Sequence, residues 1–299
     1  MNDGPLAGWH LRALLWSVAL AAAGYLAFSL WGGWQEVVAA AARVGVAGML
    51  LVLAMSLLNY GLRFLRWQAY LGALGHRVPW QPSLRIYLAG FALTTTPGKA
   101  GEALRGVFLK HWQVPYPHSF AAFFSERLSD LFAIVLLTLF GLSVYPQAQP
   151  LILLGMALVC SAWLVLSQQA LLAKFAALLP AQGSRIIGLL RQLLQVLAEA
   201  QRCHRPGMIA TATLLSLVAW GAEAVAFWWV LQWMGAEVSL AFAVFVYAIA
   251  MLAGALSFMP GGLGGAEAAM IGLLVWKGMP AADAVAATVL IRLATLWFA

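Results

Sequence analysis

The chain alternates between long apolar runs and short polar breaks. Several runs reach about 20 residues, the length that an α-helix needs to cross a bilayer, and no polar stretch is long enough to build a soluble domain. The pattern predicts an all-α integral membrane protein, a polytopic helical bundle forming a single membrane domain over residues 1–299. The predicted membrane segments are 12–31, 46–70, 83–112, 118–144, 149–167, 207–234, 239–277 and 280–299.

Composition agrees with this prediction, and the placement of charge adds an orientation. Hydrophobic residues make up 64% of the chain and charged residues 9%, whereas soluble domains carry about 25% charged residues. Basic residues gather in 63–85 and 174–205, while the connecting segments on the other side hold only Arg43. Because an excess of Lys and Arg marks the cytoplasmic side, we expect a bacterial cytoplasmic (inner) membrane protein with a cytoplasmic N-terminus. The sequence does not interleave aromatic and basic residues in the way that nucleic-acid-binding proteins do, so we expect no nucleic-acid partner.

Two predicted segments are interrupted by helix breakers and charges. The first reads "TTTPGKAGEALRG" over 94–106, and the second "SFMPGGLGGAEAAM" over 257–270. The apolar stretch before the first break and the one after it are each too short to cross a bilayer, and both carry basic residues at their outer ends. The simplest interpretation is a re-entrant hairpin at each break, because non-helical backbone inside a membrane must be enclosed by protein.

The two breaks belong to a repeat. Glu102 precedes Arg127 by 25 residues, and Glu267 precedes Arg292 by 25 residues. Matched Gly-x-x-Val patterns and tyrosines occur upstream at an offset of 160 residues. Counting spans gives the halves opposite orientations, and inverted repeats with broken helices recur in transporters. The predicted repeat halves are 46–144 and 207–299, joined by a linker span and an amphipathic helix over 149–205.

The linker contains "RIIGLLRQLLQVLAEAQR" over 185–202. Polar residues recur there at spacings of three and four, and Ile and Leu fill the opposite face, as in an amphipathic helix. Two readings remain open: the helix lies on the cytoplasmic membrane surface, or it packs against the bundle.

Ionisable residues within membrane segments are functional candidates by default, and a free helix N-terminus after each break would attract an anion. The alternative is that these charges form structural ion pairs. A contact between Arg63 and Glu223 across the pseudo-axis is a further hypothesis. The candidate substrate-binding residues are Pro97, Gly98, Lys99, Gly101, Glu102, Arg105, Glu126, Arg127, Asp130, Pro260, Gly261, Gly262, Gly264, Glu267 and Arg292.

Catalytic and cofactor motifs are missing from the sequence. "PGKAGE" is not a P-loop, because Leu93 and Ala100 stand where Gly and Ser or Thr are required. The five histidines lack metal-ligand spacing, and no nucleophile–base–acid set is visible. We therefore expect neither an enzyme nor a cofactor or metal requirement.

The motifs "RFLRW", "TPGKAGEALR", "ERLSDL" and "MPGGLGGAEA" resemble the flippase-like membrane family (UPF0104-type) that includes the transmembrane part of lysylphosphatidylglycerol synthase. The resemblance runs from about residue 45 to the end. It implies a bundle with re-entrant helices that moves lipids between leaflets, with aminoacylated phospholipids, polyprenyl-linked sugars or hopanoid-type lipids as substrates. Without the synthase's soluble catalytic domain, this chain is not expected to transfer lysine. The resemblance also implies that the last span or spans, beyond Ala299, are missing or cut.

Together these features predict a lipid transporter of flippase type, which binds a phosphate-bearing headgroup of an anionic phospholipid or lipid-linked substrate at the two broken helices. Arg105, Arg127 and Arg292 would supply countercharge. A lipid-biosynthesis enzyme and a second copy of the chain are candidate protein partners. The alternatives are an ion- or small-solute-coupled secondary transporter and a non-catalytic membrane partner of a lipid-modifying enzyme.

Overall fold

The computed structural model describes residues 34–91, 102, 104–141, 146–180, 184–257 and 259–298, and every regular element among them is a helix. The prediction of an all-helical protein is confirmed. The predicted segment 12–31 lies outside the described residues.

The α-helices are α2 (Trp34–Ala73), α3 (Trp80–Phe91), α5 (Arg105–Leu109), α6 (Tyr116–Gly141), α7 (Gln149–Ser167), α8 (Gln169–Leu178), α9 (Arg185–Ala200), α10 (Pro206–Trp233), α11 (Leu240–Leu256), α12 (Gly265–Trp276) and α13 (Ala281–Arg292). Short 3-10 turns occur at Lys110–Trp112, Pro146–Ala148, Gln201–His204 and Pro260–Gly262, and a π-helical turn at Leu293–Trp297.

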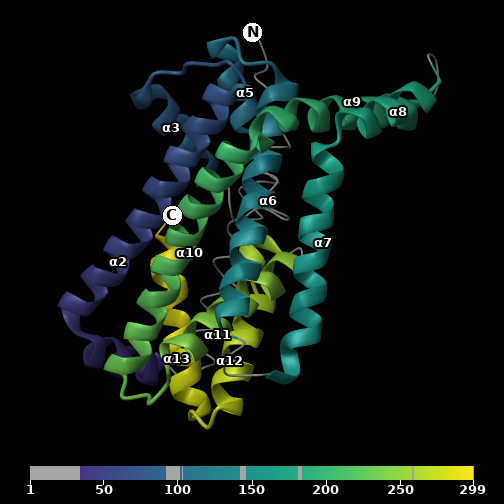
Figure 1. The fold of residues 1–299 in the computed structure, drawn as a ribbon. Coiled ribbons are helices and arrows are strands. Elements are labelled where there is room, and N and C mark those ends of the chain that lie inside the picture. The colour runs from purple at the N-terminus through teal and green to yellow at the C-terminus, as the bar shows by residue number, and fades with distance from the viewer. Residues whose placement is uncertain are drawn as a thin grey trace.

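Two long helices, α2 and α10, pack against each other along the bundle (Figure 1). By length and apolarity both could cross a membrane. Helix α2 begins twelve residues before the predicted start at 46, and the backbone leaves helical geometry at Gly45, where φ is 70°. The prediction therefore found the longer part of α2 and missed the shorter helix before the bend, because Gly45 tolerates a positive φ that lets one helix follow another.

The ends of α2 and α10 have the same cap. Gly75 and Gly235 have φ values of 90° and 84°. The amide of the residue after each glycine donates to a carbonyl five residues back, from His76 to Leu71 and from Ala236 to Leu231. This is a Schellman motif, in which a left-handed glycine closes the last turn. The repeated Gly-x-x-Val pattern thus corresponds to one repeated piece of local geometry.

The second sequence break separates α11 from α12. Gly261, Gly262 and Gly264 all have positive φ there, which only glycine adopts at low cost. The two helices pack on each other so closely that a Cβ on Gly265 would lie 2.8 Å from the Ala253 carbonyl oxygen. Most of the first break, including Pro97, Gly98, Lys99 and Gly101, lies outside the described residues.

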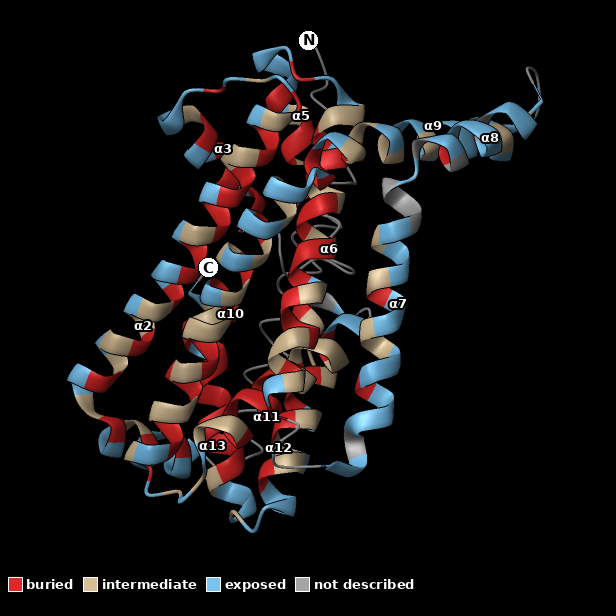
Figure 2. Ribbon diagram, in the orientation of Figure 1, coloured by how far each residue is buried: buried red, intermediate tan, exposed pale blue. Residues whose placement is uncertain are grey.

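The interior has two main apolar clusters (Figure 2). One joins α10, α11, α12 and α13 with the first half of α2 and part of α6, and it consists largely of Ala, Val, Ile and Leu. The other joins the second half of α2 with α3 and α6 and is rich in aromatic residues, including Trp67, Tyr70 and Tyr87. Helices α8 and α9 extend sideways from one end of the bundle (Figure 1).

Candidate functional site

Seven charged side chains from α2, α5, α6 and the described part of the first break meet in one group. Arg105 Nη2 lies 2.7 Å from Glu126 Oε2, and Arg127 Nη2 lies 3.3 Å from Glu102 Oε2. Asp130 accepts from Arg66 at 2.6 Å. Four arginines face three carboxylates, so the group carries one formal positive charge in excess. We call it the N-terminal charge network: Arg63, Arg66, Glu102, Arg105, Glu126, Arg127 and Asp130.

Helix α6 supplies two of the three acids of the network. Glu126 and Asp130 are four residues apart and so share a helix face, which is buried against α2. Asp130 is the centre of that contact. It forms ion pairs with Arg66 at 2.6 Å, Arg127 at 3.2 Å and Arg63 at 3.5 Å, and it also accepts from the indole of Trp220 at 2.9 Å.

The side chain of Arg105 contacts two aromatic rings where it pairs with Glu126. Its guanidinium lies 4.3 Å from the ring centroid of Trp67 and 5.0 Å from that of Tyr87, in the geometry of a cation–π contact. Gly90 provides the room, because a Cβ at that position would lie 2.6 Å from Arg105 Cδ. The side chain of Arg105 is 2% exposed, so its charge is neutralised by Glu102 and Glu126 rather than by solvent.

The second break holds a smaller assembly, which we call the C-terminal charge pair, Glu267 and Arg292. Arg292 Nε donates to Glu267 Oε1 at 2.7 Å, and Arg292 Nη2 donates to the Gly261 carbonyl at 2.7 Å. The amide of Gly264 donates to Glu267 Oε2 at 2.7 Å. Helix α12 begins just after Gly264, so the anion at its N-terminus is the carboxylate of Glu267. This differs from the expectation of a free helix end.

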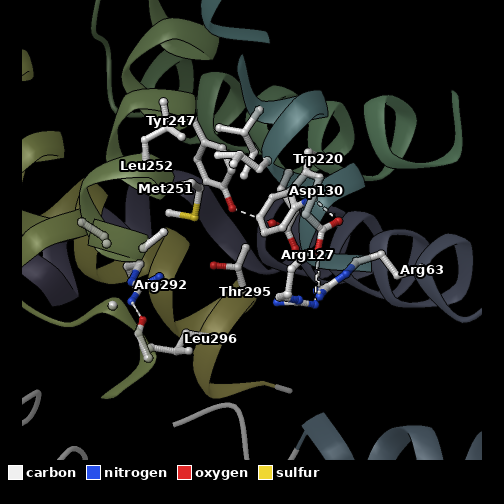
Figure 3. A pocket seen from close by; sticks show the side chains of 18 of the residues that line it. Arg63, Arg127, Asp130, Trp220, Tyr247, Met251, Leu252, Arg292, Thr295 and Leu296 are labelled. Atoms are coloured by element: carbon white, nitrogen blue, oxygen red, sulfur yellow. Dashed lines mark hydrogen bonds and ion pairs between the residues drawn. The ribbon is translucent and has the colours of Figure 1, made fainter. Parts of the chain in front are cut away.

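A cavity of about 330 Å³ lies between the two charge groups. Figure 3 shows Arg63 and Arg127 meeting at Asp130 on one side, with Arg292 on the other and Thr295 between them. Glu223 also lines the cavity, and its Oε2 accepts from the Tyr247 hydroxyl at 2.5 Å. Apolar wall residues complete the lining, among them Leu131, Ile134, Met251, Leu252 and Leu296.

The cavity arginines keep donors to spare. Arg63 is 5% exposed and lies within cation–π distance of the rings of Phe91 and Trp220. Among the atoms that the structure describes, its Nε and Nη2 and the Nε of Arg127 have no hydrogen-bond acceptor. Arg63 Nη2 is 3.5 Å from Asp130 Oδ2, which is an ion pair without a hydrogen bond. A buried donor without an acceptor is costly, so these atoms favour a ligand rich in oxygen acceptors.

The predicted residues divide into four sets. Pro97, Gly98, Lys99 and Gly101 lie outside the described residues. Glu102, Arg105, Glu126 and Glu267 are buried and belong to the two charge groups beside the cavity. Pro260 and Gly264 lie in the turn that precedes α12, where the Gly264 amide donates to Glu267. The predicted residues that line the cavity are Arg127, Asp130, Gly261, Gly262 and Arg292.

Sequence reasoning left important residues out of the candidate site. Arg63 and Arg66 are not among the predicted substrate-binding residues, yet the structure joins both to Asp130. The signal was available in "RFLRW", where two arginines three residues apart share a face of an apolar helix. Glu223 and Arg63 line the same cavity, and Glu223 accepts a hydrogen bond from Tyr247. No group of three His, Cys, Asp or Glu in the described ranges is arranged to hold a metal ion.

Known proteins resemble this chain over most of its length. The model of the family "Lysylphosphatidylglycerol synthase TM region" matches residues 14–299. A UPF0104 membrane protein of Pyrococcus horikoshii is 23% identical over 299 residues, covering 89% of this chain and 88% of the relative. A UPF0104 membrane protein of Methanothermobacter thermautotrophicus is 24% identical over 277 residues, covering 83% and 81%. Since the match spans nearly the whole chain, the protein belongs to the membrane-protein family of the lysylphosphatidylglycerol synthase TM region.

Proposed function

We propose that this protein is a lipid transporter of flippase type. The cavity between the N-terminal charge network and the C-terminal charge pair would bind the phosphate-bearing headgroup of an anionic phospholipid or lipid-linked substrate. The acyl or prenyl chains would stay along the apolar wall formed by residues such as Leu131 and Leu252. The role is transport without catalysis.

One observation carries this proposal: Arg63, Arg127 and Arg292 line one cavity, and Arg63 and Arg127 have donors without an acceptor among the described atoms. Phosphate oxygens are the acceptors that arginine binds most strongly. Three arginines and two carboxylates line the cavity, so an anion would meet a surplus of positive charge. The volume of about 330 Å³ is typical of small-molecule sites and suits a headgroup rather than a whole lipid.

The arrangement of short helices supports an inverted repeat with two re-entrant hairpins. Helices α11 and α12 have 17 and 12 residues, or about 25 and 18 Å at 1.5 Å per residue, less than the roughly 30 Å of a bilayer core. In Figure 1, the outer end of α12 and that of α5 lie at opposite ends of the bundle. We infer that each half enters the membrane from its own side, and that rocking of the halves exposes the cavity to each leaflet in turn.

The distribution of charge supports one orientation. The end of the bundle that carries α5 and α9 also carries Arg77, Lys110, Arg202 and Arg205. By the preference of basic residues for the cytoplasmic side, this end would face the cytoplasm of a bacterial cell with the N-terminus on the same side.

A transport assay in vesicles tests the proposal. The purified chain would be reconstituted with a fluorescent phosphatidylglycerol, and movement between leaflets followed by chemical quenching of the outer leaflet. Arg63→Gln and Arg127→Gln should each slow transport about tenfold or more, since a hydrogen bond to a charged group contributes about 1.5–3 kcal/mol. Arg43→Gln is the matched control, because Arg43 pairs with Asp283 away from the cavity lining.

Wild-type rates for both cavity variants would contradict the proposal. Ion flux without lipid movement would favour a secondary transporter of ions or small solutes. Movement of neither lipid nor ion, combined with co-purification of a lipid-modifying enzyme, would favour the role of a non-catalytic membrane partner.

A further inference from the structure

Helices α8 and α9, with the basic turn that follows them to Arg205, form a lateral arm on the bundle. Figure 1 shows the arm leaving the top of α7 at a steep angle and returning to the bundle where α10 begins. Figure 2 shows that most of its described residues are exposed or half-buried. The arm shares no residue with the transport cavity, so that proposed function does not account for it.

One apolar stripe runs along α9 from its free end into the bundle. At 100° per residue, Ile186, Leu189, Leu190 and Leu193 fall on one face, and these side chains are 68%, 65%, 42% and 52% exposed. Farther along the same face, Ala200 is buried in the aromatic cluster of the bundle and Val196 packs against it. The packing interpretation of this helix therefore holds for its last turn. The rest of the stripe continues outward, and the described residues leave it exposed.

The charge of the arm is almost wholly positive. Between residues 169 and 205 the sequence has five basic residues and one acidic residue, Glu199. Glu199 is already paired, with His118 Nε2 at 3.2 Å and with Arg202 Nε at 3.3 Å. On the free part of the arm, the basic residues Lys174, Arg185 and Arg191 are exposed, beside the exposed apolar side chains of Phe175 and Leu178.

The position of the arm matches the edge of a bilayer. Helix α7 presents the exposed leucines 151, 153, 154 and 158, as expected for a lipid-facing helix in a membrane-protein family. The arm begins two residues after α7 ends at Ser167, at the point where the apolar run stops. A helix that turns sideways there has its axis near the membrane surface, with its apolar stripe free to enter the acyl region and its basic residues at headgroup level.

We propose that the arm is a second lipid-binding surface, which docks onto the anionic headgroups of the leaflet at that end of the bundle. Anionic leaflets attract basic segments that lie within a Debye length of the surface. A second copy of the chain fits less well as the occupant, because two arms brought face to face would oppose identical basic residues such as Arg185. The proposal does not depend on transport through the cavity.

Depth-dependent fluorescence quenching in the full-length protein tests this surface. Cys160 and Cys203 would be replaced by Ala, and a single cysteine at Leu193 labelled with an environment-sensitive dye. The matched control is Gly188→Cys, on the polar face of the same helix, where an added Cβ would meet no atom within 4 Å. The protein would be held in nanodiscs of phosphatidylglycerol mixed with phosphatidylcholine, or of phosphatidylcholine alone.

In mixed nanodiscs the dye at position 193 should be quenched by acyl-chain nitroxides and protected from aqueous iodide, and the dye at 188 should show the reverse. Replacing Lys174, Arg185 and Arg191 together with Gln should reduce the quenching at 193 toward its value in phosphatidylcholine alone. Iodide quenching at 193 equal to that at 188 would overturn the proposal, as would identical behaviour in both lipids. Protection of position 193 from both quenchers would also overturn it, since that result indicates a protein partner or a second copy.

Discussion

The two Glu–Arg pairs have the same spacing in sequence and different surroundings in space. Glu102 and Arg127 are 25 residues apart, as are Glu267 and Arg292, and each pair is in contact. Arg292 is 4% exposed and is held by the carboxylate of Glu267 and by the Gly261 carbonyl. The side chain of Arg127 is 25% exposed, and its Nε has no acceptor among the described atoms.

Under the proposed function, this difference separates a structural role for the C-terminal charge pair from a ligand-binding role for the N-terminal charge network. The C-terminal charge pair joins the start of α12 to the end of α13. Its charged groups are bound by each other and by the backbone of the second break, at Gly261 and Gly264. The N-terminal charge network carries one positive charge in excess, and two of its arginines, Arg63 and Arg127, line the cavity. Two Glu–Arg pairs with the same spacing in sequence can therefore lie in surroundings of different net charge.

The largest effect is expected at the centre of the network. Asp130→Asn would leave Arg63, Arg66 and Arg127 without their shared carboxylate. Removing one partner of a buried ion pair costs about 3–5 kcal/mol, because an uncompensated charge remains buried. We expect a loss of that order in the free energy of unfolding, measured by denaturant titration in mild detergent.

A double variant tests the electrostatic reason for that loss. Asp130→Asn combined with Arg66→Met removes one of the stranded cations and should recover part of the stability. If the double variant is less stable than Asp130→Asn alone, repulsion among the arginines is not the cause, and the network would have to act through shape and packing.

The second prediction compares the two arginines directly. Arg292→Gln should lower the free energy of unfolding by about 2–3 kcal/mol, because it leaves Glu267 buried without its charged donor. Arg127→Gln should change stability by less than about 1 kcal/mol, since water reaches its partly exposed side chain and already solvates part of its charge, while slowing lipid transport. Equal losses of stability in the two variants would contradict the distinction between a structural C-terminal charge pair and a ligand-binding N-terminal charge network.

The third prediction places acid sensitivity outside both charge groups, where the arm joins the bundle. His204 lies in the turn before α10, near the ring of Trp163, and burial lowers its pKa from 6.5 to about 4. The pKa of His76 is also lowered, first by burial and then by His118. Between about pH 6.5 and pH 4 the unfolded chain binds a proton at His204 that the folded protein does not.

The free energy of unfolding should therefore keep its full contribution from neutral His204 above pH 6.5, and it should fall as the pH drops toward 4. His204 alone should contribute a loss of about 2 kcal/mol at about pH 5. Thermal unfolding followed at about pH 7 and about pH 5 measures it. His204→Phe keeps the aromatic volume and removes the titration, so it should reduce the pH dependence. An unchanged dependence would assign the effect to other groups.

Local sequence pattern predicted the helices because each one depends on its own apolar residues. Helix α7 has the predicted limits, 149–167, and α10 begins and ends one residue before its prediction. The bend at Gly45 was missed, since glycine in an apolar run indicates a bend only when neighbouring helices require one. The inverted repeat and the re-entrant hairpins stay predictions.

The charged site was harder to predict, because it depends on which helix faces meet. The 25-residue spacing drew attention to the two Glu–Arg pairs as parts of a repeat, but it gave no sign that Arg63 and Arg66 would join Asp130. The bond by which Glu267 caps the start of α12 was equally hard to predict. Gly264 has no side chain to complete a capping box, so the bond from its amide to Glu267 had no clear sequence signal.

The smallest effect is expected at an ion pair on the rim of the bundle. Arg43 Nη2 lies 2.5 Å from Asp283 Oδ1, a shorter distance than any ion pair within the network, yet the two side chains are 41% and 30% exposed. Exposed pairs contribute about 0–1 kcal/mol, since water already solvates both charges. Arg43→Gln should therefore leave transport unchanged and shift the unfolding midpoint only slightly, with an effect that shrinks as salt is added. A loss as large as that of Arg292→Gln would mean that distance, rather than burial, decides which charges hold this bundle together.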